Sequence, residues 1–575
     1  MKRSACVVAV LIVFVCFVSA YQNTYTNESF EFRQLVSLYR ISGMTMHGVV
    51  TPVSSDDMLF LLDEIPLERL PSEVRGDVIS LRESLQNPKH IFGSRGILFD
   101  AGIVTSPIGV YNSNETVHIR NLPFAFKDMD PLLLFEGSFF LGEHFVGSMG
   151  LDLIKSADQW DFSSFDTNLE TELNGSKMDF YRPHKAYFSS GFNRFSFILG
   201  RDRMSAGNGF SGNLTIGNNF VFQDFAKVSI LYPFVSYNMT IASFDPNETN
   251  TAEEPAKTAK NSLDFSTWDD YHPEVINHRL SLNFFNKVTL TLTEGVMQFT
   301  DNAFGTVKML NPFNILHNQF TFRNHRINNF FAIEVDAAIC PGFSMHFQFI
   351  GDQIQLKFEH ADTTPNSYGL LLNFAHSFSV LNSLATIYLE GVYTSPTLYL
   401  KDDKTSDGGQ IPPHSSDEIA YDHRHTDLIF GNKMTGYDDY QYMGYVYGPD
   451  AIVFSLGFES VNAKSAFSSS VLFMIHGENR IDKDSNAVPK APVLGDDESK
   501  FIFTPYVTGE RVPEYTLLCR VNYESKLSKA VSFRVGVAFD NRWNYENDKG
   551  VLYSNAELLL AVRIDAAGFV PSFDF

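Results

Sequence analysis

Cysteine is scarce in this chain of 575 residues, which contains only four. Two of the four fall within the first 20 residues, so only Cys340 and Cys519 remain, far apart in the sequence. So few cysteines exclude a scaffold that depends on a network of disulfides. The two remaining residues could form one disulfide, but we favour two small buried thiols.

Positive charge is also in short supply. The chain has 44 Lys and Arg residues against 67 Asp and Glu residues, a formal net charge of -23. Because phosphate groups are bound by concentrated positive charge, this balance disfavours nucleic acid as a partner.

Long apolar runs are absent after residue 20. A membrane-spanning helix needs about 18 or more consecutive apolar residues, and none is evident there. The first 20 residues differ, since Lys2 and Arg3 precede an apolar core at positions 5–18 and a small residue, Ala20. This pattern predicts a secretory signal peptide over residues 1–20. We therefore expect an exported protein that is either soluble or embedded in a membrane by another architecture.

Familiar catalytic motifs are missing as well, including G-x-S-x-G, H-E-x-x-H and the P-loop. Gly207, Gly209 and Gly212 do spell the G-x-G-x-x-G of dinucleotide-binding enzymes. That fingerprint needs a helix directly after the glycines, whereas residues 213–219 have no helical period. We interpret the glycines as a β turn or an inward fold of a sheet wall. The chain is predicted to be no enzyme and to need no cofactor.

A run of alternating His and Asp at residues 422–427 is the candidate for metal binding. Alternating ligands can lie on one face of an extended chain. The run lies in a polar, glycine-containing loop, and nothing nearby completes a convincing second shell. We therefore expect a solvated loop and no metal site.

Helical periodicity is confined to the start of the exported chain. Apolar residues spaced for one helical face predict helices over residues 55–64 and 72–86, the second with Ser72 as its N-cap. Residues 21–90 are thus predicted to form a small, mostly helical N-terminal region, either periplasmic or a plug.

After about residue 90 the period changes to two. Aromatic residues make up 14% of the chain although mean hydropathy is only -0.10, so apolar and polar residues are interleaved. In residues 514–523, Tyr515 and Cys519 share a face opposite Thr516 and Arg520, as in a β-strand, and only Leu518 is out of step. The same alternation recurs at 288–293, 333–339, 385–393, 452–459, 531–539 and 556–564.

A soluble β-sandwich would also alternate in this way. A barrel is favoured because the segments run about ten residues, the length that crosses a bilayer at a tilt, and because their polar faces carry charge and glycine. Short turns also alternate with long polar loops at 245–270, 400–450 and 478–500. We predict an all-β fold, a transmembrane antiparallel β-barrel over residues 91–575 with about 18 strands, in a range of about 14 to 20.

Three stretches resemble the Wzi-type capsule-assembly outer-membrane proteins. The first runs from Gly200 and Arg201 through the glycines to Asp224, the second is 328–353, and the third is 440–457. The helical region before the barrel is also similar to that family. The resemblance implies a non-catalytic outer-membrane barrel that attaches or organises surface polysaccharide. The strong acidity and long insertions of this chain depart from the family pattern and leave the glycan open.

Candidate glycan-binding or lumen-lining residues come from the same stretches and from the tyrosine-rich segment near residue 440. An aromatic girdle at the membrane interface is an alternative role for those tyrosines. The candidates are Arg201, Arg203, Asp224, Asp352, Tyr440, Tyr442, Tyr445 and Tyr447, with Gly207, Gly209 and Gly212 as structural glycines.

Two other functions fit the same architecture. The barrel could be a porin or substrate-specific channel, or an adhesin that displays the 400–450 loop. The partners we expect are outer-membrane lipid, surface polysaccharide and the barrel-assembly machinery, because the terminal Phe575 resembles the assembly signal of bacterial outer-membrane proteins. We expect a monomer.

Overall fold

The computed structural model describes most of the chain after residue 21. The described residues are 22–86, 92–94, 96–114, 132–155, 165–168, 178–180, 185–217, 223–243, 272–300, 309–313, 327–354, 366–399, 443–478, 503–507, 509–566 and 573–574. The predicted signal peptide, the 422–427 run, Tyr440, Tyr442 and the terminal Phe575 lie outside them.

Three α-helices form the N-terminal region: α2 (Phe30–Ile41), α3 (Ser55–Asp63) and α4 (Arg75–Gln86), with the 3-10 turn η1 (Leu67–Arg69) before α4. Serine side chains cap the first two, since Ser29 accepts from the N–H of Phe32 and Ser54 from that of Asp57. The prediction that α4 begins at Ser72 was wrong by one turn, because the N–H of Val74 donates to Pro71 in a turn that precedes the helix. No described helix is long and apolar enough to cross a membrane.

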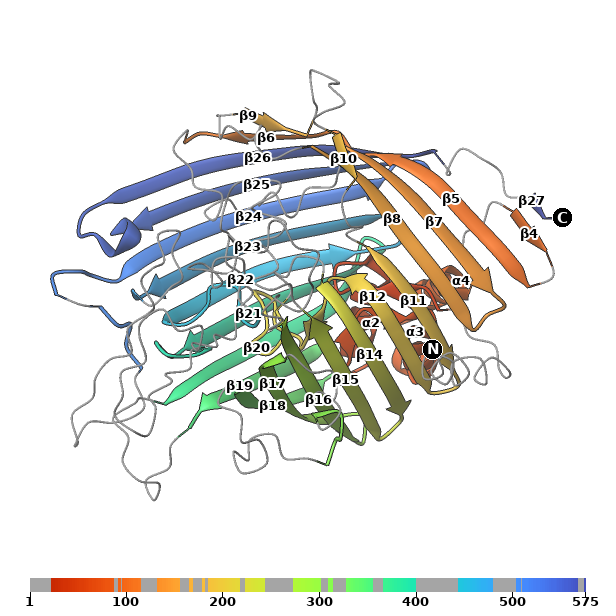
Figure 1. Ribbon diagram of the computed structural model, residues 1–575, viewed down its shortest axis with the longest axis horizontal. Coiled ribbons are helices and arrows are strands. Elements are labelled where there is room, and N and C mark those ends of the chain that lie inside the picture. The colour runs from red at the N-terminus through yellow and green to blue at the C-terminus, as the bar shows by residue number, and fades with distance from the viewer. Residues whose placement is uncertain are drawn as a thin grey trace, which may run out of the picture.

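A closed antiparallel barrel of 18 strands forms the rest of the described fold (Figure 1). Closure comes from β26, which pairs with β6 and with the end of β5, so β5 and β6 act as one wall strand interrupted at Pro107. This confirms the predicted all-β barrel and its strand number. The wall strands are β5 (Ile97–Thr105), β6 (Ile108–Asn112), β7 (Leu133–Leu141), β8 (Phe145–Lys155), β11 (Ala186–Phe192), β12 (Phe195–Asp202), β14 (Gln223–Tyr232), β15 (Val235–Ser243), β16 (His272–Phe284), β17 (Val288–Thr300), β18 (Ile327–Cys340), β19 (Phe343–Gln353), β20 (Ser367–Val380), β21 (Ser383–Thr394), β22 (Ala451–Val461), β23 (Ser465–His476), β24 (Glu514–Lys526), β25 (Val531–Trp543) and β26 (Leu552–Asp565).

Short additional strands complete the sheets. β4 (Phe92–Ser94), β9 (Phe165–Thr167), β10 (Met178–Phe180) and β27 (Phe573–Asp574) extend the wall locally. Inside the barrel, β1 (Thr24–Tyr25) pairs with β3 (Val53–Ser54), and β2 (Val50–Thr51) pairs with β13 (Ser205–Ala206).

The wall is apolar outside and polar inside, as the two-residue period predicts. On β24, Val521 and Tyr523 are exposed on the outer face, while Thr516 and the out-of-step Leu518 are buried on the inner face. Exposed Leu, Ile, Val and Phe residues recur on outward positions of nearly every strand. An apolar outer band on a closed barrel places the wall in lipid, because closure leaves no unpaired strand edge.

Short turns gather at one end of the barrel. Asn286, Gly342 and Asn382 take positive φ angles in these hairpins, which glycine and asparagine tolerate best. The N-terminal helices pack inside the barrel at this end, where Leu231, Leu384, Val461 and Ala466 of the wall join their apolar core. Helix α2 contacts the inner side of β19, β20, β21 and β22.

The two cysteines are both free thiols. Cys340 is exposed beside a hairpin turn, and Cys519 is half-buried on the outer face of β24. The expectation that both are buried was therefore wrong, because the outward positions of a barrel wall face the surroundings.

Candidate binding site in the barrel lumen

Charged wall residues hold the N-terminal segment inside the lumen. The ammonium group of Lys227, on β14, donates to the carbonyl oxygens of Val50 (2.6 Å) and Pro52. The guanidinium of Arg279, on β16, and the amide of Asn238, on β15, both donate to the carbonyl oxygen of Gly48, at 3.1 and 3.2 Å. Extended backbone that crosses the lumen is thus satisfied by long polar side chains of the wall.

The Arg279 side chain is itself part of a buried ion pair. Its guanidinium donates to both carboxylate oxygens of Glu334 on β18, one of them at 2.8 Å, and the two side chains are 3% and 0% exposed. Such a bidentate pair fixes geometry well. Since removal of one partner would leave a buried charge alone, the pair ties the position of Gly48 to two wall strands.

A second segment, residues 203–217, folds from the opposite end into the lumen. It begins where β12 ends and carries the glycine motif. Gly207 has φ +121, and a Cβ there would lie 2.0 Å from Nε2 of Gln348. A Cβ on Gly209 would lie 1.8 Å from the carbonyl oxygen of Gly212. The motif therefore permits a tight inward fold, the second of the two interpretations offered for it, and residues 213–217, which follow it in the described chain, form no helix.

Glu390, on the inner face of β21, holds the tip of this inserted loop. Its carboxylate accepts from the backbone N–H of Phe210 (2.8 Å), from the N–H and hydroxyl of Ser211 (2.7 and 2.5 Å) and from the amide of Asn373 (3.1 Å). The side chain is almost fully buried. Consecutive backbone N–H groups around a carboxylate form a concave anion site, here filled by the chain's own residue.

Further wall residues fix the base of the inserted loop. The amide of Asn208 donates to Asp336 of β18 at 2.9 Å, and Asp336 also contacts Nδ1 of His346 at 2.8 Å. The N–H of Leu214 donates to Gln348 of β19 at 2.9 Å. The loop is thus held by four consecutive strands, β18 to β21.

Aromatic rings link the inserted loop to the N-terminal region. The ring of Phe210 stacks on Tyr388 of β21, with centroids 3.8 Å apart and planes at 3°. On its other side, the guanidinium carbon of Arg40 in α2 lies 5.0 Å from the same ring. This arrangement combines stacking with a cation–π contact. The two segments inside the lumen therefore touch each other as well as the wall.

The segment 443–448 closes over the inserted loop. Tyr445 is fully buried, its hydroxyl lies 2.9 Å from that of Ser211, and its N–H donates to the hydroxyl of Tyr399 at 2.9 Å. Its ring packs on Gly212. Burial, with a further contribution from the nearby carboxylate of Glu390, raises the pKa of Tyr445 well above its usual range. The phenol stays neutral and available for hydrogen bonding.

A cavity of about 1040 Å³ remains beside these filled parts of the lumen. It lies between α2, the inserted loop and the wall formed by β5, β7, β8 and β22 to β26. Seven acidic and seven basic residues line it: Glu28, Glu31, Asp100, Glu136, Asp202, Glu459 and Glu524, with Arg33, Arg40, Lys185, Arg203, Arg520, Arg534 and Arg563.

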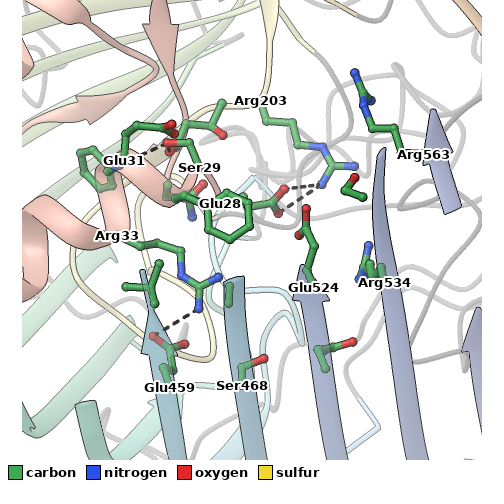
Figure 2. A pocket seen from close by; sticks show the side chains of 18 of the residues that line it. Glu28, Ser29, Glu31, Arg33, Arg203, Glu459, Ser468, Glu524, Arg534 and Arg563 are labelled. Carbon is green, nitrogen blue, oxygen red and sulfur yellow. Dashed lines mark hydrogen bonds and ion pairs between the residues drawn. The ribbon is translucent and has the colours of Figure 1, made fainter. Parts of the chain in front are cut away.

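Several of these charges meet across the cavity, as Figure 2 shows. Arg203 reaches from the inserted loop to Glu28, with N–O distances of 3.2 and 3.3 Å. Arg563 of β26 donates to Glu136 of β7 at 3.0 Å. Arg534 stands directly opposite Glu524 in the β24–β25 register. The cavity is therefore polar and charge-balanced, in a chain whose net charge is -23.

The sequence-based candidates fall into three groups. Arg203 lines the cavity, and Asp352 is a buried inward-facing residue of β19. Arg201 and Asp224 pair at 2.7 Å directly across β12 and β14, but they alternate with the inward-facing Asp202 and Phe225. Strand alternation therefore turns the pair away from the lumen, and Arg201 is buried there at 4% exposed.

Two of the four tyrosine candidates lie within the described residues. Tyr445 packs on the inserted loop, and Tyr447 lies next to it with ring centroids 5.6 Å apart. Tyr440 and Tyr442 lie outside the described residues. Gly207, Gly209 and Gly212 all belong to the inserted loop, which brings them beside Tyr445 and Gln348.

Sequence analysis missed the wall residues that hold the two segments. Lys227, Arg279, Glu334, Asp336 and Glu390 are all inward-facing polar residues in otherwise alternating strands. A charged residue at an inward position of an alternating strand could have marked these residues as facing the lumen. It would not have told an open lumen from a filled one, because both place polar residues there. The partner of each charge could not be inferred from it. Within the described residues, no group of His, Cys, Asp and Glu is arranged to hold a metal ion.

The closed 18-stranded wall, its apolar exterior and its polar, filled interior define an outer-membrane β-barrel. Among solved structures, the fold is similar to that of Wzi, an outer membrane protein involved in group 1 capsule assembly in Escherichia coli and a carbohydrate-binding β-barrel. The TM-score is 0.55 at 11% identity, over 96% of this chain and 100% of that one. The predicted resemblance to Wzi-type proteins is thus confirmed for the fold.

Two further solved structures, the outer membrane channel DcaP and OccD3, are more distantly similar. DcaP of Acinetobacter baumannii has a TM-score of 0.33 at 7% identity, over 83% of this chain and 100% of that one. OccD3 of Pseudomonas aeruginosa has a TM-score of 0.38 at 8% identity, over 84% of this chain and 96% of that one. No protein-family model and no curated protein sequence matches the chain.

Proposed function

We propose that the protein is a non-catalytic outer-membrane barrel that binds surface polysaccharide and takes part in its attachment or assembly. The observation that carries the proposal is the filled lumen. The N-terminal region and the inserted loop are each held by buried charged contacts, Arg279 with Glu334 for the first and Glu390 with Ser211 for the second. An interior fixed in this way supports a binding role over free diffusion through a pore.

The fold likeness to Wzi supports the same proposal, since that barrel is described as carbohydrate-binding. Sugars are held by polar groups that both donate and accept hydrogen bonds. Serines and asparagines of this kind line the cavity, and its arginines add further donors. We also propose that the N-terminal region, residues 21–90, acts as the plug and that it faces the periplasm, because it lies at the end with the short turns.

The proposal is tested by deletion of the gene in its own host. We expect loss of surface polysaccharide into the medium, measured by quantifying cell-bound and released polysaccharide, with restoration by the intact gene. Unchanged retention in the deletion strain would overturn the proposal. As a control, the deletion strain is complemented with the Glu73→Gln variant, which changes an exposed residue next to α4. This variant should restore polysaccharide retention fully.

A substrate-specific channel is the second candidate, and the balanced cavity favours it. Opposed acidic and basic side chains, such as Glu524 and Arg534, are suited to guide charged solutes. Planar bilayer recordings with purified protein separate the two candidates. Large, stable conductance steps would support the channel, whereas the filled lumen leads us to expect none. The adhesin alternative rests on the 400–450 loop, most of which lies outside the described residues.

A further inference from the structure

One arginine of the cavity differs from its neighbours. Arg203, Arg534 and Arg563 each stand against a carboxylate, of Glu28, Glu524 and Glu136 in turn. Within the described residues, Arg520 makes neither a hydrogen bond nor an ion pair, and its Nε atom is buried without a partner. A buried donor left unsatisfied is costly, so a partner for it is expected from outside the described chain.

Asn522, two positions further along β24, has a buried hydrogen-bond acceptor without a donor in the described part of the chain. Asn522 points to the same inner face as Arg520, about 7 Å away by strand geometry. Its Oδ1 atom is buried and accepts no hydrogen bond from the described residues. One strand face thus offers the cavity a cationic donor and, next to it, a neutral acceptor.

The side chains of Arg520 and Asn522 are partly exposed as a whole, and only small residues flank them on the neighbouring strands. Ser470 and Ala538 lie beside Arg520 in the registers of β23 and β25, and Ser468 and Gly536 lie beside Asn522. All four neighbours are small. The space above this pair is therefore part of the cavity, which both residues line.

We propose that Arg520 and Asn522 form a binding site for a carboxylated saccharide. The carboxylate would accept from the Arg520 guanidinium, and a ring hydroxyl would donate to the side-chain amide oxygen of Asn522, with the Ser468 hydroxyl as a further partner. Arginine binds carboxylates through charge-assisted hydrogen bonds. This inference rests on the proposed polysaccharide role, because the hydroxyl-rich part of the ligand comes from there.

The test compares three monosaccharides that share a ring and differ in charge: glucuronate, glucose and glucosamine. Titrations of the full-length protein in detergent, followed by ligand-observed NMR, should show glucuronate binding about tenfold more tightly than glucose, as one charge-assisted hydrogen bond predicts. Arg520→Ala should lower glucuronate affinity to the level of glucose. Arg69→Ala, which removes an exposed arginine of η1, should leave all affinities unchanged.

A second variant, Asn522→Asp, tests the same site in case Arg520→Ala folds poorly. Asn522→Asp replaces the acceptor by a carboxylate, so glucuronate binding should fall at least tenfold while glucose binding remains and glucosamine binding rises. Equal binding of glucuronate and glucose would overturn the proposal, and so would inorganic phosphate binding as tightly as glucuronate. If the deletion strain loses polysaccharide but the purified protein does not bind glucuronate, only the proposed site is wrong. If the protein binds glucuronate but the deletion strain retains its polysaccharide, only the proposed function is wrong.

Discussion

Ser211 gives both its backbone N–H and its hydroxyl to the same carboxylate oxygen of Glu390, at 2.7 and 2.5 Å. The two residues are 179 positions apart in the chain. One belongs to the inserted loop and the other to the inner face of β21. Their contact closes one side of the lumen, and it makes Glu390 the residue on which the position of the loop depends most directly.

Replacement of this carboxylate should therefore release the loop. Glu390→Gln puts an amide group where a backbone N–H of Phe210 or Ser211 now donates, so a buried donor loses its acceptor. We expect a loss of about 1–3 kcal/mol in the free energy of unfolding. Thermal unfolding in detergent, followed by heat-modifiable migration on gels, measures the change. Glu68→Gln, at an exposed position of η1, is the control and should leave the transition in place.

The glycine motif offers a matched pair of substitutions. Gly207→Ala should destabilise the protein by about 1–3 kcal/mol, since its Cβ would overlap Gln348 and its φ is +121. Gly76→Ala in α4 meets nothing within 4 Å and should stabilise the helix by about 0.5–1 kcal/mol. Opposite shifts of the unfolding transition are expected. Equal shifts would show that the inward fold of the loop does not depend on Gly207.

The alternation of side chains was enough to predict the wall. Tyr515 and Cys519 share one face of β24, opposite Thr516 and Arg520, as predicted, and the one residue out of step, Leu518, joins the apolar core inside. The periodicity, the length of the segments and the spacing of turns follow from local sequence. Strand number followed from chain length, because each strand and its connection use a similar number of residues.

The contents of the lumen could not be predicted in the same way. Helix α2 was not predicted because its apolar residues form no single narrow stripe. The helix is buried on several sides, and its core residues include Phe30, Leu35, Leu38 and Tyr39. The inserted loop depends on pairs such as Glu390 with Ser211, whose partners lie far apart in sequence. Arg201 and Asp224 show another limit, since the motif named both residues but neither their pairing nor the face on which they lie could be inferred from it.

A double-mutant cycle on Arg279 and Glu334 would measure how firmly the N-terminal region is held. Arg279→Met and Glu334→Leu should each cost about 3–5 kcal/mol, because each leaves a buried charge alone. The double variant should cost clearly less than the sum of the two, since it removes both charges. The unfolding free energy in detergent gives the coupling. Additive losses would mean that the two side chains do not act as a pair.

Acidity at the start of α3 should make stability depend on pH. Burial, with a smaller contribution from Asp57, raises the pKa of Asp56 to about 7. In the unfolded chain an aspartate titrates near ~3.9. The folded form therefore holds its proton more tightly, so the contribution of Asp56 to stability is largest below about pH 4 and is lost as pH rises through about 7.

Asp56→Asn removes this titration. We expect the variant to match the native protein at pH 4 and to unfold at a higher temperature than the native protein at pH 8. Melting temperatures measured from pH 4 to pH 8 in the same detergent provide the comparison. Glu73→Gln removes one carboxylate at an exposed position outside α3. Its melting temperature should follow that of the native protein at every pH. Melting temperatures of Asp56→Asn that stay parallel to those of the native protein would contradict the raised pKa of Asp56. A difference that opens only above pH 5 would confirm that the charged form of Asp56 is disfavoured at its partly buried site.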